Sequence, residues 1–175
     1  MSGKTEEKDI NLLIAQKLQA YLEIGGAYVL MTREEDEALG KTKSADMNKR
    51  KHITNDMQAD IFVSVHQNSF GSPNVSGAQA FYYKNSPKSK LLADCIQKYL
   101  RTDLSSKNDR ESKGNSSYYV LKQTTIPSVI VECGFISNSA DRKNLNDDAY
   151  QEKVAWAIYE GIVDYFQQEA SLRNS

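Results

Sequence analysis

Residues 126–131 constrain the fold of this chain more than any other segment. They form an apolar, mostly β-branched run that contains Pro127 near its start and leads directly into Glu132. Such a run predicts a strand buried within a parallel sheet. A carboxylate at the end of a buried strand loses its hydration, which costs several kcal/mol or raises its pKa. Glu132 therefore indicates either a catalytic carboxylate or one half of a buried ion pair.

A second apolar run, residues 61–65, also ends in a side chain suited to chemistry, His66. Ligands of open α/β sheets bind at the carboxyl ends of the strands, so we expect His66 and Glu132 to share one active site. A neutral imidazole held at a strand end is a good zinc ligand; a histidine that is only hydrogen-bonded there is the alternative. His52 follows three basic residues on a predicted helix, and we expect a solvated surface side chain.

Predicted strands and helices alternate along the chain. Apolar residues at helical spacing predict helices over about residues 7–24 and 46–59, after Ser86-Pro87, and from Asp148, with Gln151 completing a capping box. Apolar or aromatic runs predict strands over residues 27–31, 61–65, 79–83, 118–121 and 128–132. Residues 101–117 are charged and serine-rich, which predicts a mobile surface loop. We therefore expect a single α/β domain over residues 1–175, with a mostly parallel, twisted sheet covered by helices on both faces.

The composition argues against partners that bind through a strong overall charge. The 175 residues are 39% hydrophobic and 26% charged, and the net charge is −1. No overall field therefore favours nucleic acid or an anionic membrane. No apolar run approaches the roughly 20 residues of a membrane-spanning helix. Cys95 and Cys133 fall at apolar positions, where buried free thiols are expected.

Three segments together resemble a known enzyme family. They are residues 7–12 (EKDINL), 64–69 (SVHQNS) and 131–138 (VECGFISN). In this order they resemble the zinc-dependent N-acetylmuramoyl-L-alanine amidases of amidase family 3, and the resemblance covers nearly the whole chain. Residues 76–79 (SGAQ) and 150–154 (YQEKV) look closest to the sporulation and germination-specific cortex amidases within that family.

The resemblance assigns roles to particular residues. It implies that Glu7 and His66 are zinc ligands and that Glu132 is the catalytic base, whereas spacing alone would make Glu7 a carboxylate at a helix N-terminus. The family takes its third ligand, a histidine, from a strand ending in a Gly-His-Gly-Gly segment that would lie upstream of Met1. We therefore expect that strand and ligand to be missing, and zinc binding to be weak or absent. Asn68 and Arg33 are expected to contact substrate. Arg33, Arg110 and Lys113 carry the charge needed to meet stem-peptide carboxylates, although each also fits a solvated surface charge.

The resemblance also implies a reaction and a location. The reaction is hydrolysis of the amide between N-acetylmuramic acid and L-alanine of the peptidoglycan stem peptide, in spore cortex maturation, where muramic-δ-lactam forms. The expected location is outside the cell membrane, in the cell wall or spore cortex space. Two alternatives remain open: a peptidoglycan-binding module whose metal site is lost, and an amidase that needs a protein partner to hold zinc or order the site.

Overall fold

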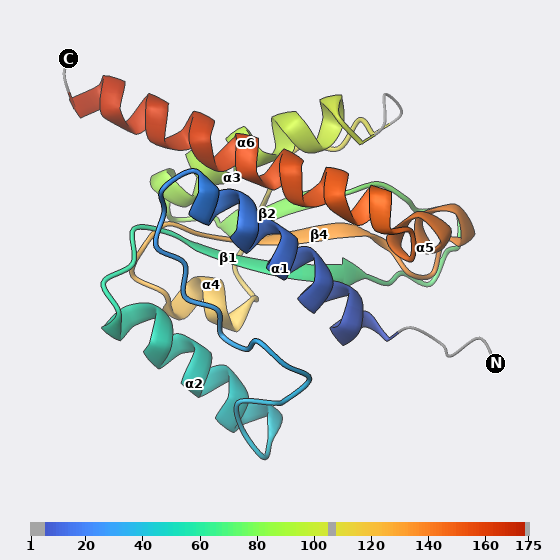
Figure 1. The fold of residues 1–175 in the computed structure, drawn as a ribbon, viewed down its shortest axis with the longest axis horizontal. Coiled ribbons are helices and arrows are strands. Elements are labelled where there is room, and N and C mark those ends of the chain that lie inside the picture. The colour runs from blue at the N-terminus through green and yellow to red at the C-terminus, as the bar shows by residue number, and fades with distance from the viewer. Residues whose placement is uncertain (1–5, 105–107, 174–175) are drawn as a thin grey trace.

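A four-stranded sheet forms the centre of the computed structural model, which describes residues 6–104 and 108–173 (Figure 1). Its strands are β1 (Phe62–Asn68), β2 (Gln79–Tyr83), β3 (Lys113–Asn115) and β4 (Ser128–Phe135), in the spatial order β1-β4-β2-β3. β1 pairs parallel with β4 and β2 pairs parallel with β3, while β2 and β4 are antiparallel. The prediction of a mostly parallel sheet in one α/β domain is confirmed.

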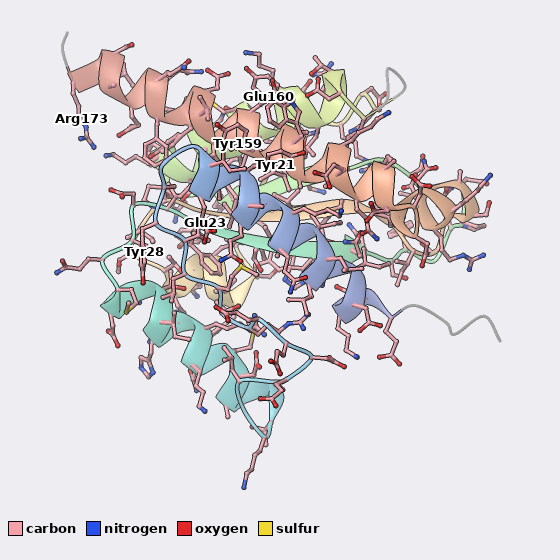
Figure 2. All side chains as sticks on the ribbon, viewed as in Figure 1. Tyr21, Glu23, Tyr28, Tyr159, Glu160 and Arg173 are labelled. Atoms are coloured by element: carbon pink, nitrogen blue, oxygen red, sulfur yellow. The ribbon has the colours of Figure 1, made fainter. Side chains whose placement is uncertain are left out.

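Helices cover both faces of this sheet (Figure 1). They are α1 (Glu7–Ile24), α2 (Lys43–Asp56), α3 (Pro87–Thr102), α4 (Tyr119–Gln123), α5 (Ser139–Leu145) and α6 (Asp148–Arg173). Helices α1, α3 and α6 pack together on one face, and α2 and α4 lie on the other. Figure 2 shows Tyr21 of α1 beside Tyr159 of α6, with ring centroids 5.9 Å apart. Both cysteines are buried and free, as expected.

Local signals set the start of α3 as predicted, but not the start of α6. The Ser86 hydroxyl accepts a hydrogen bond from the Ser89 amide (3.2 Å), and Pro87 opens α3. The capping box predicted for α6 is wrong, because the Asp147 carboxylate accepts from the Tyr150 amide (2.9 Å). Gln151 is buried instead and donates to the carbonyl of Leu145 (2.8 Å).

Two of the predicted strands do not form. Residues 27–31 belong to no ladder, and Tyr28, labelled in Figure 2, is 89% exposed. Residues 118–121 turn into α4, because Asn115 Oδ1 accepts from the amides of Ser117 (2.7 Å) and Tyr118 (3.0 Å) and bends the chain. Helix α2 also begins earlier than predicted, with Thr42 as its N-cap.

The predicted loop over residues 101–117 is partly anchored. It contains β3, and Asn108 is buried and donates to the carbonyl of Ala78 (3.0 Å). The described part of this segment is therefore not the free surface loop that its composition suggested. Residues 105–107 lie outside the described residues.

A wide cleft runs beside β1. Within residues 6–104 and 108–173, β1 pairs only with β4, so its other edge makes no ladder. A cleft of about 1110 Å³ lies there, lined by α1, residues 26–33, α2 and β1, and it reaches His66 and Glu132. The residues at the carboxyl ends of β1 and β4 thus open into this cleft.

Close packing of α6 on α3 depends on Gly161, and it gives a stability prediction. A Cβ at this position would lie 2.4 Å from Ile96 Cα. We expect Gly161→Ala to lower the free energy of unfolding by about 1–3 kcal/mol, because the helices must separate, despite the roughly 1 kcal/mol that alanine gains in helix propensity. Denaturant unfolding measures the change. Gly71→Ala, where a Cβ meets nothing within 4 Å, is the control, and equal stability of the two variants would contradict this account.

Candidate active site

His66 and Glu132 lie side by side at the carboxyl ends of two adjacent strands. They are register partners in the parallel β1–β4 pair, so their side chains leave the same face of the sheet. This is the juxtaposition expected from the two apolar runs. The site therefore stands on two adjacent strands, β1 at the edge of the sheet and β4 within it, and needs no loop to bring these residues together.

Glu7 reaches this pair from the first turn of α1, which packs against β1. Its Oε1 lies 3.4 Å from His66 Nδ1 and accepts hydrogen bonds from the Gln67 amide (3.3 Å) and from Asn11 Nδ2 (3.3 Å). These interactions, that with His66 foremost, lower the pKa of Glu7. An ionised carboxylate and an imidazole nitrogen therefore face each other.

The ring of His66 is held from both sides. Its Nε2 lies 2.9 Å from the hydroxyl of Ser64, two residues earlier on β1, while Nδ1 faces Glu7. A partner on one ring nitrogen restrains the orientation of the ring. Nδ1 is therefore the nitrogen available to a metal ion shared with Glu7.

Glu132 is a buried carboxylate without an ion-pair partner. It is 7% exposed, and burial raises its pKa, an effect that the nearby His66 opposes and the charge of Glu7 reinforces. Its Oε2 makes no hydrogen bond, and no lysine or arginine of the described residues pairs with it. The buried ion pair that the sequence left open is thus not formed there. A carboxylate with a raised pKa in a cleft is suited to proton transfer.

Sequence reasoning gave no role to Tyr118, which lies against this carboxylate. Its hydroxyl is 3.5 Å from Glu132 Oε1, and its ring packs edge-on against Phe81 at 5.6 Å. Burial raises the pKa of Tyr118, so the hydroxyl stays a proton donor. The turn at Asn115 that aims this side chain was the available signal, but the residue was assigned to a strand.

The two residues predicted to contact substrate, Asn68 and Arg33, lie near the site, and their side chains hydrogen-bond to nearby backbone groups. Asn68 ends β1, and its Oδ1 accepts from the Ser69 amide (2.8 Å). Arg33 donates to the carbonyls of Lys8 and Glu35, which holds the following loop against the start of α1. Their contact with substrate stays a prediction. His52 is exposed on α2, as expected.

The residues present supply part of a metal site. Glu7 Oε1 and His66 Nδ1 converge as two suitable donors, but the described residues contain no group of three or more His, Cys, Asp or Glu side chains that could hold a metal ion. Catalytic zinc sites usually have three protein ligands. The geometry therefore fits a zinc ion with one protein donor still to be supplied.

Comparisons with known proteins bear on the family. The sequence profile of the N-acetylmuramoyl-L-alanine amidase family, Amidase_3, matches residues 1–164. The germination-specific N-acetylmuramoyl-L-alanine amidase of Bacillus subtilis (strain 168) is 35% identical over 177 residues, covering 97% of this chain and 74% of the relative.

Solved structures agree with that match. The CwlD amidase from Clostridioides difficile, in complex with the GerS lipoprotein, has a TM-score of 0.91 at 43% identity and covers 94% of this chain and 88% of its own. The catalytic domain of CwlV, an amidase from Bacillus (Paenibacillus) polymyxa var. colistinus, has a TM-score of 0.81 at 30% identity, with coverage of 94% and 87%. The chain therefore belongs to the N-acetylmuramoyl-L-alanine amidase family, whose members are peptidoglycan hydrolases.

Proposed function

We propose that this chain hydrolyses the amide between N-acetylmuramic acid and L-alanine with the help of zinc, and that Glu132 is its catalytic base. The observation that carries the proposal is that His66 and Glu132 lie side by side at the carboxyl ends of β1 and β4, with Glu7 next to His66. Family membership supports the bond that is cut.

Glu7 and His66 would hold the zinc ion through Oε1 and Nδ1. A zinc ion bound there would supply two effects, acidification of a water molecule and polarisation of the amide carbonyl. A third zinc ligand has space to reach this site. The free edge of β1 and the cleft beside it leave room for an added strand or a protein partner next to His66.

Glu132 moves the protons of the reaction. As a base it takes a proton from the attacking water while the new C–O bond forms, and it then gives this proton to the nitrogen of L-alanine as the C–N bond breaks. Its raised pKa suits both steps, since the same carboxyl must accept a proton and release it. The Tyr118 hydroxyl, 3.5 Å from Oε1, orients the carboxylate for this transfer.

We also propose a biological setting and a partner. Similarity to the germination-specific amidase of Bacillus subtilis supports action in the cell wall or spore cortex, where trimming of stem peptides precedes muramic-δ-lactam formation. The complex of CwlD with the GerS lipoprotein supports a protein partner that completes or orders the metal site. No helix within residues 6–104 and 108–173 is long and apolar enough to cross a membrane.

The reaction is tested with a soluble N-acetylmuramoyl peptide in the presence of zinc, with products identified by mass spectrometry. We expect N-acetylmuramic acid and an intact peptide that begins with alanine. Binding of the substrate without any cleavage, under conditions where zinc is bound, would favour the binding module instead. Cleavage of a bond within the peptide would contradict the proposed amidase.

A further inference from the structure

Arg110 is held in one orientation beside the candidate active site. Its Nε donates to the carbonyl of Ser76 (2.7 Å), and its Nη1 donates to Gln79 Oε1 (3.1 Å). The guanidinium also lies over the ring of Phe135, with Cζ 4.8 Å from the ring centroid. Three contacts on three segments thus fix a side chain that is normally mobile when it lies at a surface.

Gln79, which accepts a hydrogen bond from Arg110, lies in register with His66 and Glu132 across the sheet. Gln79 pairs with Glu132 across the antiparallel β2–β4 ladder, just as His66 pairs with Glu132 across β1–β4. Side chains opposite each other in such a ladder lie about 5 Å apart on one face. Arg110, one side chain beyond Gln79, is therefore on the order of 10 Å from the carboxyl of Glu132.

The backbone around Arg110 is also anchored. Asn108 is 8% exposed, and its Oδ1 accepts from the Arg110 amide (3.4 Å). Gly77 has φ +96, and a Cβ there would lie 2.8 Å from Asn108 Oδ1 and 3.4 Å from Arg110 Nε. The close approach of this turn thus depends on glycine, and the position of Arg110 is built into the fold.

The charge of Arg110 is engaged in no direct ion pair within the described residues, and the carboxylate of Asp141 accepts instead from the amides of Gly77 and Phe135 (2.9 Å each). Arg50 and Arg101 pair with Asp46 and Glu111, but Arg110 forms no ion pair with any described carboxylate. Its Nη2 has no hydrogen-bond acceptor among the described residues. A fixed guanidinium with a free donor is suited to a carboxylate ligand, because the side chain loses little further conformational entropy on binding.

We infer that Arg110 binds the free α-carboxylate of the second stem-peptide residue, the glutamate that follows L-alanine and is linked onward through its side chain. An extended peptide advances about 3.3–3.6 Å per residue, so this carboxylate falls within the roughly 10 Å between Glu132 and Arg110. The inference rests on the proposed function. Arg110 thereby makes the enzyme selective for stems whose glutamate carboxyl is not amidated.

Binding to a variant with strongly reduced turnover tests this selectivity. Two N-acetylmuramoyl tripeptides that differ only in this carboxyl, free in one and amidated in the other, are titrated calorimetrically into Glu132→Gln. Adding Arg110→Gln should weaken binding of the free-carboxylate ligand by about 10–100-fold, the range for a hydrogen bond to a charged group, and binding of the amidated ligand by less than about threefold. Adding Arg142→Gln, an exposed arginine on α5, should change neither.

Each outcome decides the question. Equal losses for the two ligands, no loss for either, or no measurable binding of the free-carboxylate ligand would overturn the assignment of Arg110. If Arg110→Gln unfolds the protein, Gln79→Met is used in its place. Gln79→Met removes the acceptor that orients the Arg110 guanidinium but keeps the charge of Arg110, so it should weaken binding by less and with the same selectivity. If the chain with Glu132 intact cleaves neither ligand while the binding pattern holds, the amidase proposal fails and Arg110 keeps its role.

Discussion

Glu132→Gln is expected to lower the rate of N-acetylmuramoyl-L-alanine hydrolysis by about 10²–10⁴-fold, the usual contribution of a general acid–base group. The amide of glutamine fills the same space but takes no proton from water. Zinc affinity should stay the same, because Glu132 is not one of the proposed ligands. The rate and the zinc content of the same preparation measure both effects, and a loss of zinc together with activity would contradict the separate roles.

The same substitution should not destabilise the protein. Burial raises the pKa of Glu132 in the folded state above its unfolded value. The folded state therefore loses stability as pH rises from the unfolded pKa through the folded pKa, and the charged carboxylate is unfavourable above that range. Glutamine carries no charge, so at pH 8 Glu132→Gln should be at least as stable to thermal unfolding as the original chain. A clearly lower unfolding temperature would show that the carboxylate is stabilised by contacts absent from this account.

His66→Ala is expected to remove both zinc binding and hydrolysis. Loss of a residue that only supports a ligand costs about 10–100-fold in metal affinity, so loss of a direct ligand should exceed about 100-fold. Titration against a competing chelator measures the affinity, and the hydrolysis assay measures the rate. His52→Ala, at the other histidine, lies exposed on α2 and should change neither. Equal zinc affinity in the two variants would remove His66 from the metal site.

The elements with internal signals were predictable from sequence. The apolar run before Glu132 gave β4, and the Ser86-Pro87 pair gave the start of α3. Residues 27–31 have strand-like composition, but a strand needs a hydrogen-bonded neighbour, and the edge of β1 near them pairs with no described strand. Composition reports what a segment favours and not whether a partner is present.

The candidate site was predictable as far as strand ends determine it. The runs ending in His66 and Glu132 predicted their juxtaposition, and the β1–β4 register has it. The placement of Glu7 depended on the family resemblance, because a first-turn carboxylate is ordinarily explained by the helix dipole. Tyr118 and the setting of Arg110 depend on a turn and on long-range contacts across β2, which no periodicity of the sequence indicates.

The most direct test of the central claim is to identify the amino termini that the chain exposes in purified, intact peptidoglycan with zinc present. Dinitrophenylation of new amino groups after digestion should yield alanine as the new terminus, and the parallel digestion with Glu132→Gln should yield almost none. New termini other than alanine, or equal amounts of alanine from Glu132→Gln, would contradict the claim that Glu132 is the base of an N-acetylmuramoyl-L-alanine amidase.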